Sequence, residues 1–348
     1  MKVIKPTAFI AGISGQDGAH LADYLLKLGY KVYGGFRSSA TNKIWRTDYL
    51  GITDKIDFFE FHLEDFQCII DVFKKIQPDE IYNLAGESFV SDSFHHPNHT
   101  IEINTQGTVN ILEAAKLTSP DSKIFIASSS EIFGQNKDGG SLNEKSTKNP
   151  VNPYAISKLS ADFFVKLYRE QYGLFVCSGI LFNHEGPLRS QHFVTRKISH
   201  NMARIKLGDQ ESFKLGGFDS ARDWGAAVDY VKAMHLMLES EQPNDYVIAT
   251  GKLTTIRQVV EISANFLGFD PVFKGDGDKE ICTDRKSGNV LVSISSDYYR
   301  SFDTAPMIGD ATLIKEALGW SPKQTLEQMM HSMIEADLYR IEQEIACM

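Results

Sequence analysis

The spacing of Gly12, Gly15 and Gly18 places the strongest constraint on the fold of this chain. These glycines follow a short apolar run at residues 7–11 and precede residues 19–29, where apolar side chains recur at helical spacing. A strand, a glycine turn and a helix in this order are the context of a dinucleotide fingerprint. Glycine lets the backbone approach a pyrophosphate, which then lies at the positive start of the helix. The motif therefore predicts a bound dinucleotide, and the alternative is an ordinary strand-to-helix turn.

Strand and helix patterns alternate along the first half of the chain. Further buried-strand runs occupy residues 31–36, 56–61, 80–85, 123–127 and 173–182. Segments with helical spacing separate these runs. The alternation predicts an α/β fold, built on a doubly wound Rossmann-type parallel sheet with right-handed crossovers.

The pattern loosens in the second half and predicts a smaller α/β lobe. We expect residues 1–182 to form the dinucleotide-binding domain, with the chain returning to it at about residues 225–250. Residues 183–348 are expected to form mainly the substrate-binding lobe. No repeat, long linker or low-complexity tract interrupts the sequence, so two interleaved lobes fit better than two independent domains.

Two segments at the start of the second lobe lack clear periodicity. Residues 183–187, Asn-His-Glu-Gly-Pro, are expected to form a turn. Residues 216–224 are expected to form a loop that carries Arg222.

Composition and charge exclude several classes of function. The 348 residues are 42% hydrophobic, which allows a substantial core, and carry a net charge of −9, which argues against nonspecific binding to nucleic acid or anionic membranes. A local basic pocket for a phosphorylated small molecule stays compatible with that charge. The four cysteines form no Cys-x-x-Cys pair, so we expect neither a metal site nor a disulfide framework. The sequence has no apolar run of about 18 residues and no signal-peptide core, so a reducing cytoplasm is the simplest expectation.

The segment from Ser128 to Lys158 carries the candidate chemistry. An apolar run at residues 123–127 leads into Ser-Ser-Ser-Glu at 128–131, as at the carboxyl end of a parallel strand. Tyr154 and Lys158 stand four apart and share one face of a helix, for which Pro153 is a suitable start. A neighbouring ammonium lowers the pKa of a phenol toward that of a working base. With 13 tyrosines, a chance Tyr-x-x-x-Lys is expected, so its position after the serine–glutamate cluster is the informative feature.

The end of the second predicted strand indicates which dinucleotide binds. A site that prefers NAD commonly has an acidic residue there, whereas this chain has Arg37, Ser38 and Ser39. A guanidinium and two hydroxyls suit a 2′-phosphate. We therefore expect NADP, and the alternative is a solvated loop.

Motifs along nearly the whole chain resemble those of a known family. The glycine turn, the serine–glutamate cluster and Tyr-x-x-x-Lys resemble extended short-chain dehydrogenases/reductases. Within that superfamily, the chain closely resembles the GDP-mannose 4,6-dehydratase family. The matching motifs are Gly-Ile-Ser-Gly-Gln-Asp-Gly at 12–18, Leu-Phe-Asn-His-Glu at 181–185, Phe-Val-Thr-Arg-Lys-Ile at 193–198, Arg-Asp-Trp-Gly at 222–225, Asp-Tyr-Val-Lys-Ala-Met at 229–234 and Val-Ile-Ala-Thr-Gly at 247–251.

The resemblance implies conversion of GDP-mannose, or a close GDP-hexose or GDP-heptose, to the 4-keto-6-deoxy sugar with loss of water. Tyr154 would remove the 4-hydroxyl proton while hydride passes from carbon 4 to NADP and later returns at carbon 6. Lys158 would hold the nicotinamide ribose and lower the pKa of Tyr154. Glu131 would remove the carbon-5 proton and help expel the 6-hydroxyl, and its alternative is a carboxylate at a helix start. Ser129 stands where the family usually has Thr, and either hydroxyl can bond the 4-oxygen.

The resemblance also implies a set of binding residues, although each cation alone is more often a surface charge. The cofactor-binding residues would be Gly12, Gly15, Gln16, Asp17, Gly18, Arg37, Leu63, Leu84, Ala85, Ser88, Tyr154, Lys158, His184 and Arg189. The substrate-binding residues would be Ser88, Ser130, Asn183, Lys197, Arg222 and Arg300.

Several positions depart from the family pattern and leave alternatives open. His62 replaces an Asp expected against the adenine, Leu188 replaces one of two consecutive arginines, and Glu87 replaces a Gln; Gly186 and Ser301 also differ. A GDP-manno-heptose or GDP-N-acetylglucosamine therefore stays open as the substrate. A GDP-sugar epimerase or 4-ketoreductase, or a noncatalytic NADP-binding regulator, are the other readings, and the retained Glu131 favours dehydration.

We also expect a homo-oligomer, a dimer or tetramer. In the family that the chain resembles, the loop after the second strand can reach a neighbouring subunit's cofactor site. Residues 37–42 form a polar loop without apolar anchors, so its order would depend on such a partner.

Overall fold

The computed structural model describes residues 5–37, 44–134, 140–298 and 306–346. These residues form two compact units. The first unit extends to residue 182 and also includes residues 227–249 and 309–321. The second unit contains residues 183–226, 250–308 and those from 322 onward.

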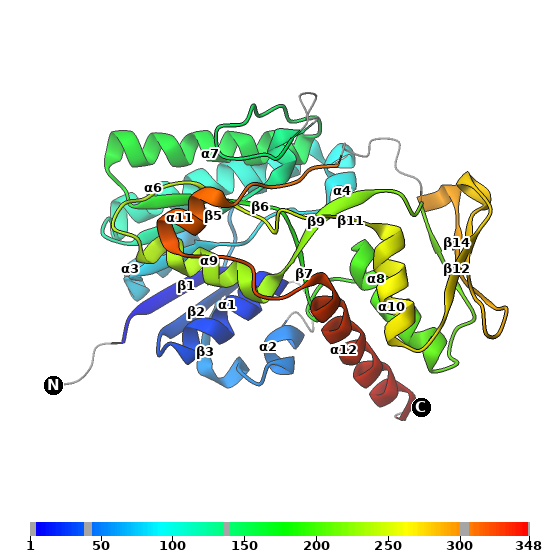
Figure 1. Ribbon diagram of the computed structural model, residues 1–348. Coiled ribbons are helices and arrows are strands. Elements are labelled where there is room, and N and C mark those ends of the chain that lie inside the picture. Colours follow the sequence, from blue (N-terminus) through cyan, green and yellow to red (C-terminus); the bar gives the residue numbers. More distant parts are fainter. Residues whose placement is uncertain (1–4, 38–43, 135–139, 299–305, 347–348) are drawn as a thin grey trace. The chain divides into compact units, whose positions relative to one another are not determined.

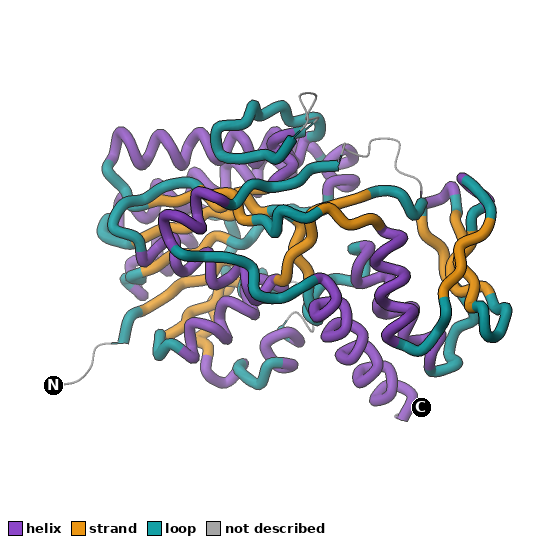
Figure 2. The backbone as a smooth tube through the Cα atoms, in the orientation of Figure 1, coloured by secondary structure: helices purple, strands orange, loops and turns teal. Residues whose placement is uncertain are grey.

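A seven-stranded sheet, parallel at every pairing, forms the middle layer of the first unit (Figure 2). Its strand order is β10-β6-β5-β4-β1-β2-β3. The strands are β1 (Thr7–Ala11), β2 (Lys31–Phe36), β3 (Ile56–Glu60), β4 (Glu80–Asn83), β5 (Lys123–Ser129), β6 (Val176–Leu181) and β10 (Tyr246–Ile248). The α/β fold with a doubly wound parallel sheet, predicted from the alternating patterns, is thereby confirmed.

Helices cover both faces of this sheet (Figure 1). One buried apolar cluster includes Leu21 and Leu25 of α1 and Met234 of α9. A second cluster, formed with other strand residues, includes Phe73 of α3 and Leu112 of α6. The helices of the first unit are α1 (Gln16–Lys27), α2 (Trp45–Tyr49), α3 (Phe66–Ile76), α4 (Val90–His95), α5 (Pro97–Ile101), α6 (Gly107–Thr118), α7 (Pro153–Tyr172), α9 (Ala227–Glu239) and α11 (Thr312–Leu318).

The order of the strands locates the crevice where such sheets bind ligands. From β1, the chain adds β2 and β3 on one side, and then β4, β5 and β6 on the other. The loops that follow β1 and β4 therefore diverge at the carboxyl edge of the sheet, which is the topological switch point.

The second unit has two small sheets and three helices among its described residues. One sheet has the order β11-β9-β7 and the other β12-β13-β14-β8. Helices α8, α10 and α12 pack against one another. The elements are β7 (Asn183–Glu185), α8 (Val194–Lys206), β8 (Phe213–Leu215), β9 (Ala221–Ala226), β11 (Leu253–Thr255), α10 (Ile256–Phe266), β12 (Pro271–Lys274), β13 (Ile281–Asp284), β14 (Val290–Ile294) and α12 (Leu326–Ala346).

Two expectations for this unit were wrong. Asn183–Glu185 forms strand β7 instead of a turn, and Arg222 lies on strand β9 instead of in a loop. The two strands pair with each other in parallel, and β9 also pairs with β11. Pairing between distant segments stabilises these short strands, and their own sequences lack the alternation that would reveal them.

No helix in the described ranges has both the length and the apolar content required to cross a lipid bilayer.

Candidate active site

The glycine turn between β1 and α1 leaves no room for a side chain at position 12 or position 18. Gly12 has a φ of +83°, and a Cβ atom on it would lie 2.7 Å from the backbone nitrogen of Ala85. A Cβ atom on Gly18 would lie 2.4 Å from the carbonyl oxygen of Gly12, which also accepts the N–H of Gly15 over 2.9 Å. Glycine at positions 12, 15 and 18 thereby leaves part of the backbone around the positive start of α1 without side chains. These residues fit a dinucleotide pyrophosphate.

The neighbouring loops bring several predicted cofactor residues to the same edge. Leu84 donates its N–H to the carbonyl of Ala11 over 3.0 Å, which fixes the loop after β4 beside the glycine turn. Ser88 is exposed further along that loop. Leu63 follows β3, and its carbonyl accepts from Asn110 Nδ2 over 2.8 Å. At the start of α1, Gln16 Nε2 donates to Asp17 Oδ1 over 3.1 Å.

Arg37 follows β2 directly and lies near an acidic partner. Its Nη2 atom is 3.4 Å from Oε1 of Glu87, and the two side chains are 47% and 34% exposed. The N–H of Glu87 in turn donates to Asn104 Oδ1 over 2.9 Å. A 2′-phosphate at this strand end would therefore share Arg37 with a carboxylate. Ser38 and Ser39 lie outside the described residues.

His62 is another departure at this edge of the sheet. Its Nε2 atom lies 3.2 Å from Glu60 and its Nδ1 atom 3.5 Å from Glu64. The ring therefore lies between two carboxylates where the family pattern has one.

Glu131 is held at the end of β5 by two hydrogen bonds. Strand β5 continues to Ser129, and a short 3₁₀ turn, Ser130–Phe133, follows it. The Ser129 Oγ atom accepts the N–H of Glu131 over 3.2 Å. Asn152 Nδ2 donates to Glu131 Oε2 over 3.1 Å. Ser130 is buried beside them.

Tyr154 and Lys158 lie on α7, which packs against β5 and the 3₁₀ turn. Asn152 caps the helix by accepting the N–H of Ala155 over 2.7 Å, so the helix begins next to Glu131. Tyr154 and Lys158 are both 9% exposed. Lys158 Nζ donates to the carbonyl of Ala127 over 2.8 Å. Burial lowers the pKa of Lys158 to about 8, and the charge of Asp162 opposes that change.

The second unit contains the other predicted binding residues. His184 is buried on β7, and Asn183 precedes it. Arg222 on β9 donates from Nη1 to the carbonyl of Ala221 over 2.8 Å. Lys197 on α8 has its Nζ 3.4 Å from the centre of the Tyr298 ring, and burial lowers its pKa. Arg300 lies outside the described residues.

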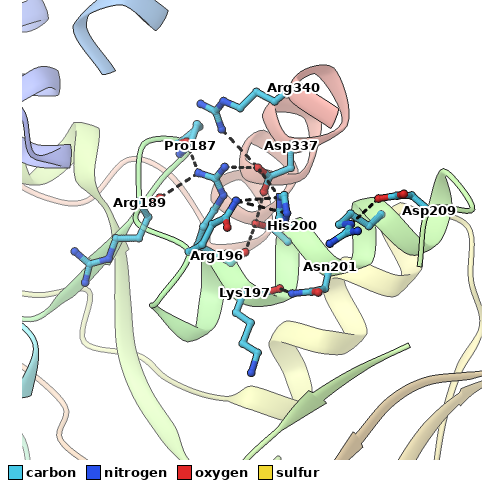
Figure 3. Close-up of polar contacts among 12 residues, drawn as sticks. Pro187, Arg189, Arg196, Lys197, His200, Asn201, Asp209, Asp337 and Arg340 are labelled. Atoms are coloured by element: carbon cyan, nitrogen blue, oxygen red, sulfur yellow. Dashed lines mark hydrogen bonds and ion pairs between the residues drawn. The ribbon is translucent and has the colours of Figure 1, made fainter. Parts of the chain in front are cut away.

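Arg189 and Lys197 flank a buried ionic cluster (Figure 3). Arg189 Nε lies 2.9 Å from Glu185 Oε2, and its guanidinium stacks 3.4 Å from the centre of the Phe193 ring. The carbonyl of Arg189 accepts from Nη1 of Arg196 over 3.1 Å. Arg196 pairs with Asp337 on α12, whose side chain is fully buried. The position of the Arg189 backbone therefore depends on helix α12.

Three polar residues of the site were not predicted from the sequence. Asn104 bonds Glu87 through both its amide atoms and donates to Ser157 Oγ over 3.0 Å. Asn152 bonds Glu131, and Asp162 accepts from Ser128. The Asn-Pro pair at 152–153 is a helix-start signal that would have indicated Asn152. For the other two, the partners are distant in sequence and no local pattern marks them.

The described residues of the first unit therefore combine three chemical elements at one sheet edge. The glycine turn fits a dinucleotide, Tyr154 with Lys158 can move a proton at a hydroxyl, and Glu131 can take a second proton. A carboxylate base beside a proton-transferring pair and a dinucleotide site suits an elimination coupled to oxidation.

Comparison with known proteins agrees with this combination. The model of the GDP-mannose 4,6 dehydratase family matches residues 9–333. A GDP-mannose 4,6-dehydratase of Yersinia enterocolitica is 40% identical over 97% of this chain and 95% of its own. The structure of DesIV, a dTDP-glucose 4,6-dehydratase from Streptomyces venezuelae with NAD and TYD bound, is 22% identical with a TM-score of 0.80, over 97% of this chain and 98% of its own. RMD from Pseudomonas aeruginosa complexed with NADPH has 24% identity and a TM-score of 0.76, over 97% of this chain and 100% of its own. The chain belongs to the GDP-mannose 4,6-dehydratase family, as its motifs predicted.

Proposed function

We propose that this chain is a GDP-mannose 4,6-dehydratase, which converts GDP-mannose to GDP-4-keto-6-deoxymannose with loss of water. The observation that carries the proposal is the placement of Glu131 at the end of β5, bonded to Asn152 at the start of the helix with Tyr154 and Lys158. An epimerase or a 4-ketoreductase needs the tyrosine and the lysine but has no need of this carboxylate. The 40% identity to the Yersinia enterocolitica enzyme supports the same activity.

Four residues share the proton transfers and hydrogen bonds of the proposed reaction. Tyr154 Oη removes the 4-hydroxyl proton, Ser129 Oγ bonds the 4-oxygen, and the charge of Lys158 favours the Tyr154 phenolate. Glu131 then removes the carbon-5 proton, which the new ketone acidifies, and gives a proton to the departing 6-hydroxyl. The glycine turn and Lys158 would hold the nicotinamide cofactor, which when bound would supply the hydride chemistry that links carbon 4 to carbon 6.

We propose NADP as this cofactor, held by the glycine turn and Arg37. The support is the cation at the end of β2 and the absence of an acidic residue at position 37. Leu63, Leu84, Ala85 and Ser88 would line the same crevice. His184 and Arg189 are also proposed as cofactor-binding residues, as the family resemblance implies.

We propose that the second unit binds the nucleotide of the substrate, because residues 183–348 are predicted to form the substrate-binding lobe. Asn183, Lys197 and Arg222 would hold GDP, with Arg300, and Ser88 and Ser130 would contact the sugar. Lys197 supports this role because burial lowers the pKa of its ammonium, which a diphosphate would stabilise. A cytoplasmic location would supply both the nucleotide sugar and the cofactor.

A homo-oligomer is part of the proposal. Ile156, Phe163 and Leu167 are exposed along one face of α7, and Phe163 is 67% exposed. A second copy of the chain is the proposed partner of this face. Light scattering on the wild type is expected to give a dimer or tetramer, and Phe163→Asp is expected to reduce the mass. A monomer at micromolar concentration for the wild type would contradict the assembly.

The decisive test of the activity uses no added reductant. The protein is incubated with GDP-mannose, GDP-manno-heptose or GDP-N-acetylglucosamine, and the product mass is measured. Loss of one water from GDP-mannose is the expected result. An isomer of unchanged mass would indicate the epimerase, and water loss from another sugar alone would reassign the substrate.

A further inference from the structure

Asp162 lies one helical turn beyond Lys158 on the face of α7 that carries Tyr154. These three residues stand at intervals of four along the helix, so they form one row. Asp162 Oδ2 accepts from Ser128 Oγ on β5 over 2.7 Å. Its Oδ1 accepts from Ser178 Oγ on β6 over 2.5 Å. The carboxylate is therefore fixed to both strands beneath the site.

Lys158 is fixed by the same end of β5. Its Nζ donates to the carbonyl of Ala127, which is next to Ser128 in the strand. A Cβ atom on Gly86 would lie 3.5 Å from this Nζ, so the loop after β4 covers the ammonium. A buried ammonium requires a nearby negative charge to stay protonated.

We propose that Asp162 is a positioning residue for the reaction, the negative charge that keeps the Lys158 ammonium protonated one helical turn from Tyr154. This role rests on the proposed dehydration, in which the charge of Lys158 supports the Tyr154 phenolate. Asp162 touches neither the sugar nor the cofactor in this role, and it acts only through Lys158.

The charged groups around the pair are compatible with this role. Asp162 is the charge that raises the pKa of Lys158 against burial, which lowers it to about 8. Burial raises the pKa of Asp162 to about 6, and the hydroxyls of Ser178 and Ser128 oppose that rise. Asp245 raises it further, but Arg169 pairs with Asp245 and limits its field.

The pKa shifts of Lys158 and Asp162 determine how activity should depend on pH. Between about pH 6 and pH 8, both Asp162 and Lys158 are charged. Removing the carboxylate leaves burial unopposed, so Lys158 loses its proton at a lower pH. The alkaline limb of the kcat/KM profile then moves to lower pH, whereas a purely structural role for Asp162 would lower activity at every pH.

The test measures the ionisation of Lys158 directly. The protein as purified is acylated with acetic anhydride in competition with a free amine at several pH values, and mass spectrometry gives the reactivity of Lys158. Asp162→Asn keeps the shape and most hydrogen bonds, and its Lys158 is expected to titrate about one pH unit lower than in the wild type. Glu113→Gln is the matched control, because Glu113 bonds Tyr168 on a distant turn of α7 and leaves Lys158 unaffected.

An unchanged Lys158 titration in folded Asp162→Asn overturns the proposal. If circular dichroism shows that this variant does not fold, Ser178→Ala replaces it. Loss of that hydroxyl weakens the ionised form of Asp162, so a smaller downward shift of Lys158 is expected, and no shift again overturns the role. Because the labelling needs no substrate, failure of the dehydration assay with a shifted Lys158 would reject the proposed function alone.

Discussion

The side-chain amide of Asn152 donates a hydrogen bond to Oε2 of Glu131 over 3.1 Å. The carbonyl oxygen of the same amide caps α7 by accepting the N–H of Ala155 over 2.7 Å. One side chain therefore fixes the proposed elimination base relative to the helix that carries Tyr154. The two functions of Asn152 can be separated by substitution.

Asn152→Ser keeps a good helix cap and removes the amide donor. Serine and asparagine are similar caps, so the free energy of unfolding is expected to change little, whereas dehydration slows about tenfold because one charge-assisted hydrogen bond is lost. Asn152→Ala loses both functions and is expected to cost about 1 kcal/mol of stability as well. Steady-state rates and urea titrations measure the two effects. Full activity in Asn152→Ser would show that Glu131 does not depend on the amide.

Tyr154→Phe and Glu131→Gln are expected to fail at different steps. The first removes the hydroxyl that moves the 4-hydroxyl proton, so oxidation at carbon 4 slows by about 100- to 10,000-fold. The second keeps the oxidation but removes the base for the carbon-5 proton, so absorbance at the NADPH band rises in a single turnover while the product mass stays without water loss. A Glu131→Gln enzyme that dehydrates at the wild-type rate would remove Glu131 from the mechanism.

Arg37 and Glu87 give a paired test of cofactor choice. Arg37→Ala is expected to weaken NADP binding much more than NAD binding, because the contact to the 2′-phosphate is lost. Glu87→Gln removes the carboxylate 3.4 Å from Arg37 and is expected to tighten NADP binding by a few-fold, the modest size typical of half-exposed pairs. Fluorescence titrations with both cofactors measure these changes. Equal losses for NAD and NADP in Arg37→Ala would contradict the assignment.

Asp337 and Asp209 give a matched test of stability in the second unit. Asp337 is fully buried, pairs with Arg196 and accepts from Ser199 Oγ over 2.7 Å. Asp337→Asn leaves Arg196 buried without this partner and is expected to cost about 3–5 kcal/mol in the free energy of unfolding. Asp209→Asn breaks an exposed pair with Arg204 and is expected to cost less than about 1 kcal/mol. Similar losses of stability in the two variants would show that the buried pair contributes no more to the free energy of unfolding than the exposed pair.

Local pattern determined the frame of the first unit. The glycine turn, the buried strand runs and the four-residue spacing of Tyr154 and Lys158 each lie within a few residues, where backbone periodicity fixes which side chains share a face. The carboxyl ends of parallel strands meet at one edge, so the clustering of the site followed from the fold class. The family motifs then supplied the proposed roles of individual residues.

Only the tertiary structure decided which distant residues meet. Strands β7 and β9 exist as strands through their pairing with each other, so a turn and a loop were expected in their place. The bonds of Asn152 to Glu131, of Asp162 to Ser128 and Ser178, and of Arg196 to Asp337 join segments that no periodicity links. Such contacts form only when the packing of helices and strands brings polar groups from distant segments together. A local sequence pattern does not encode that geometry.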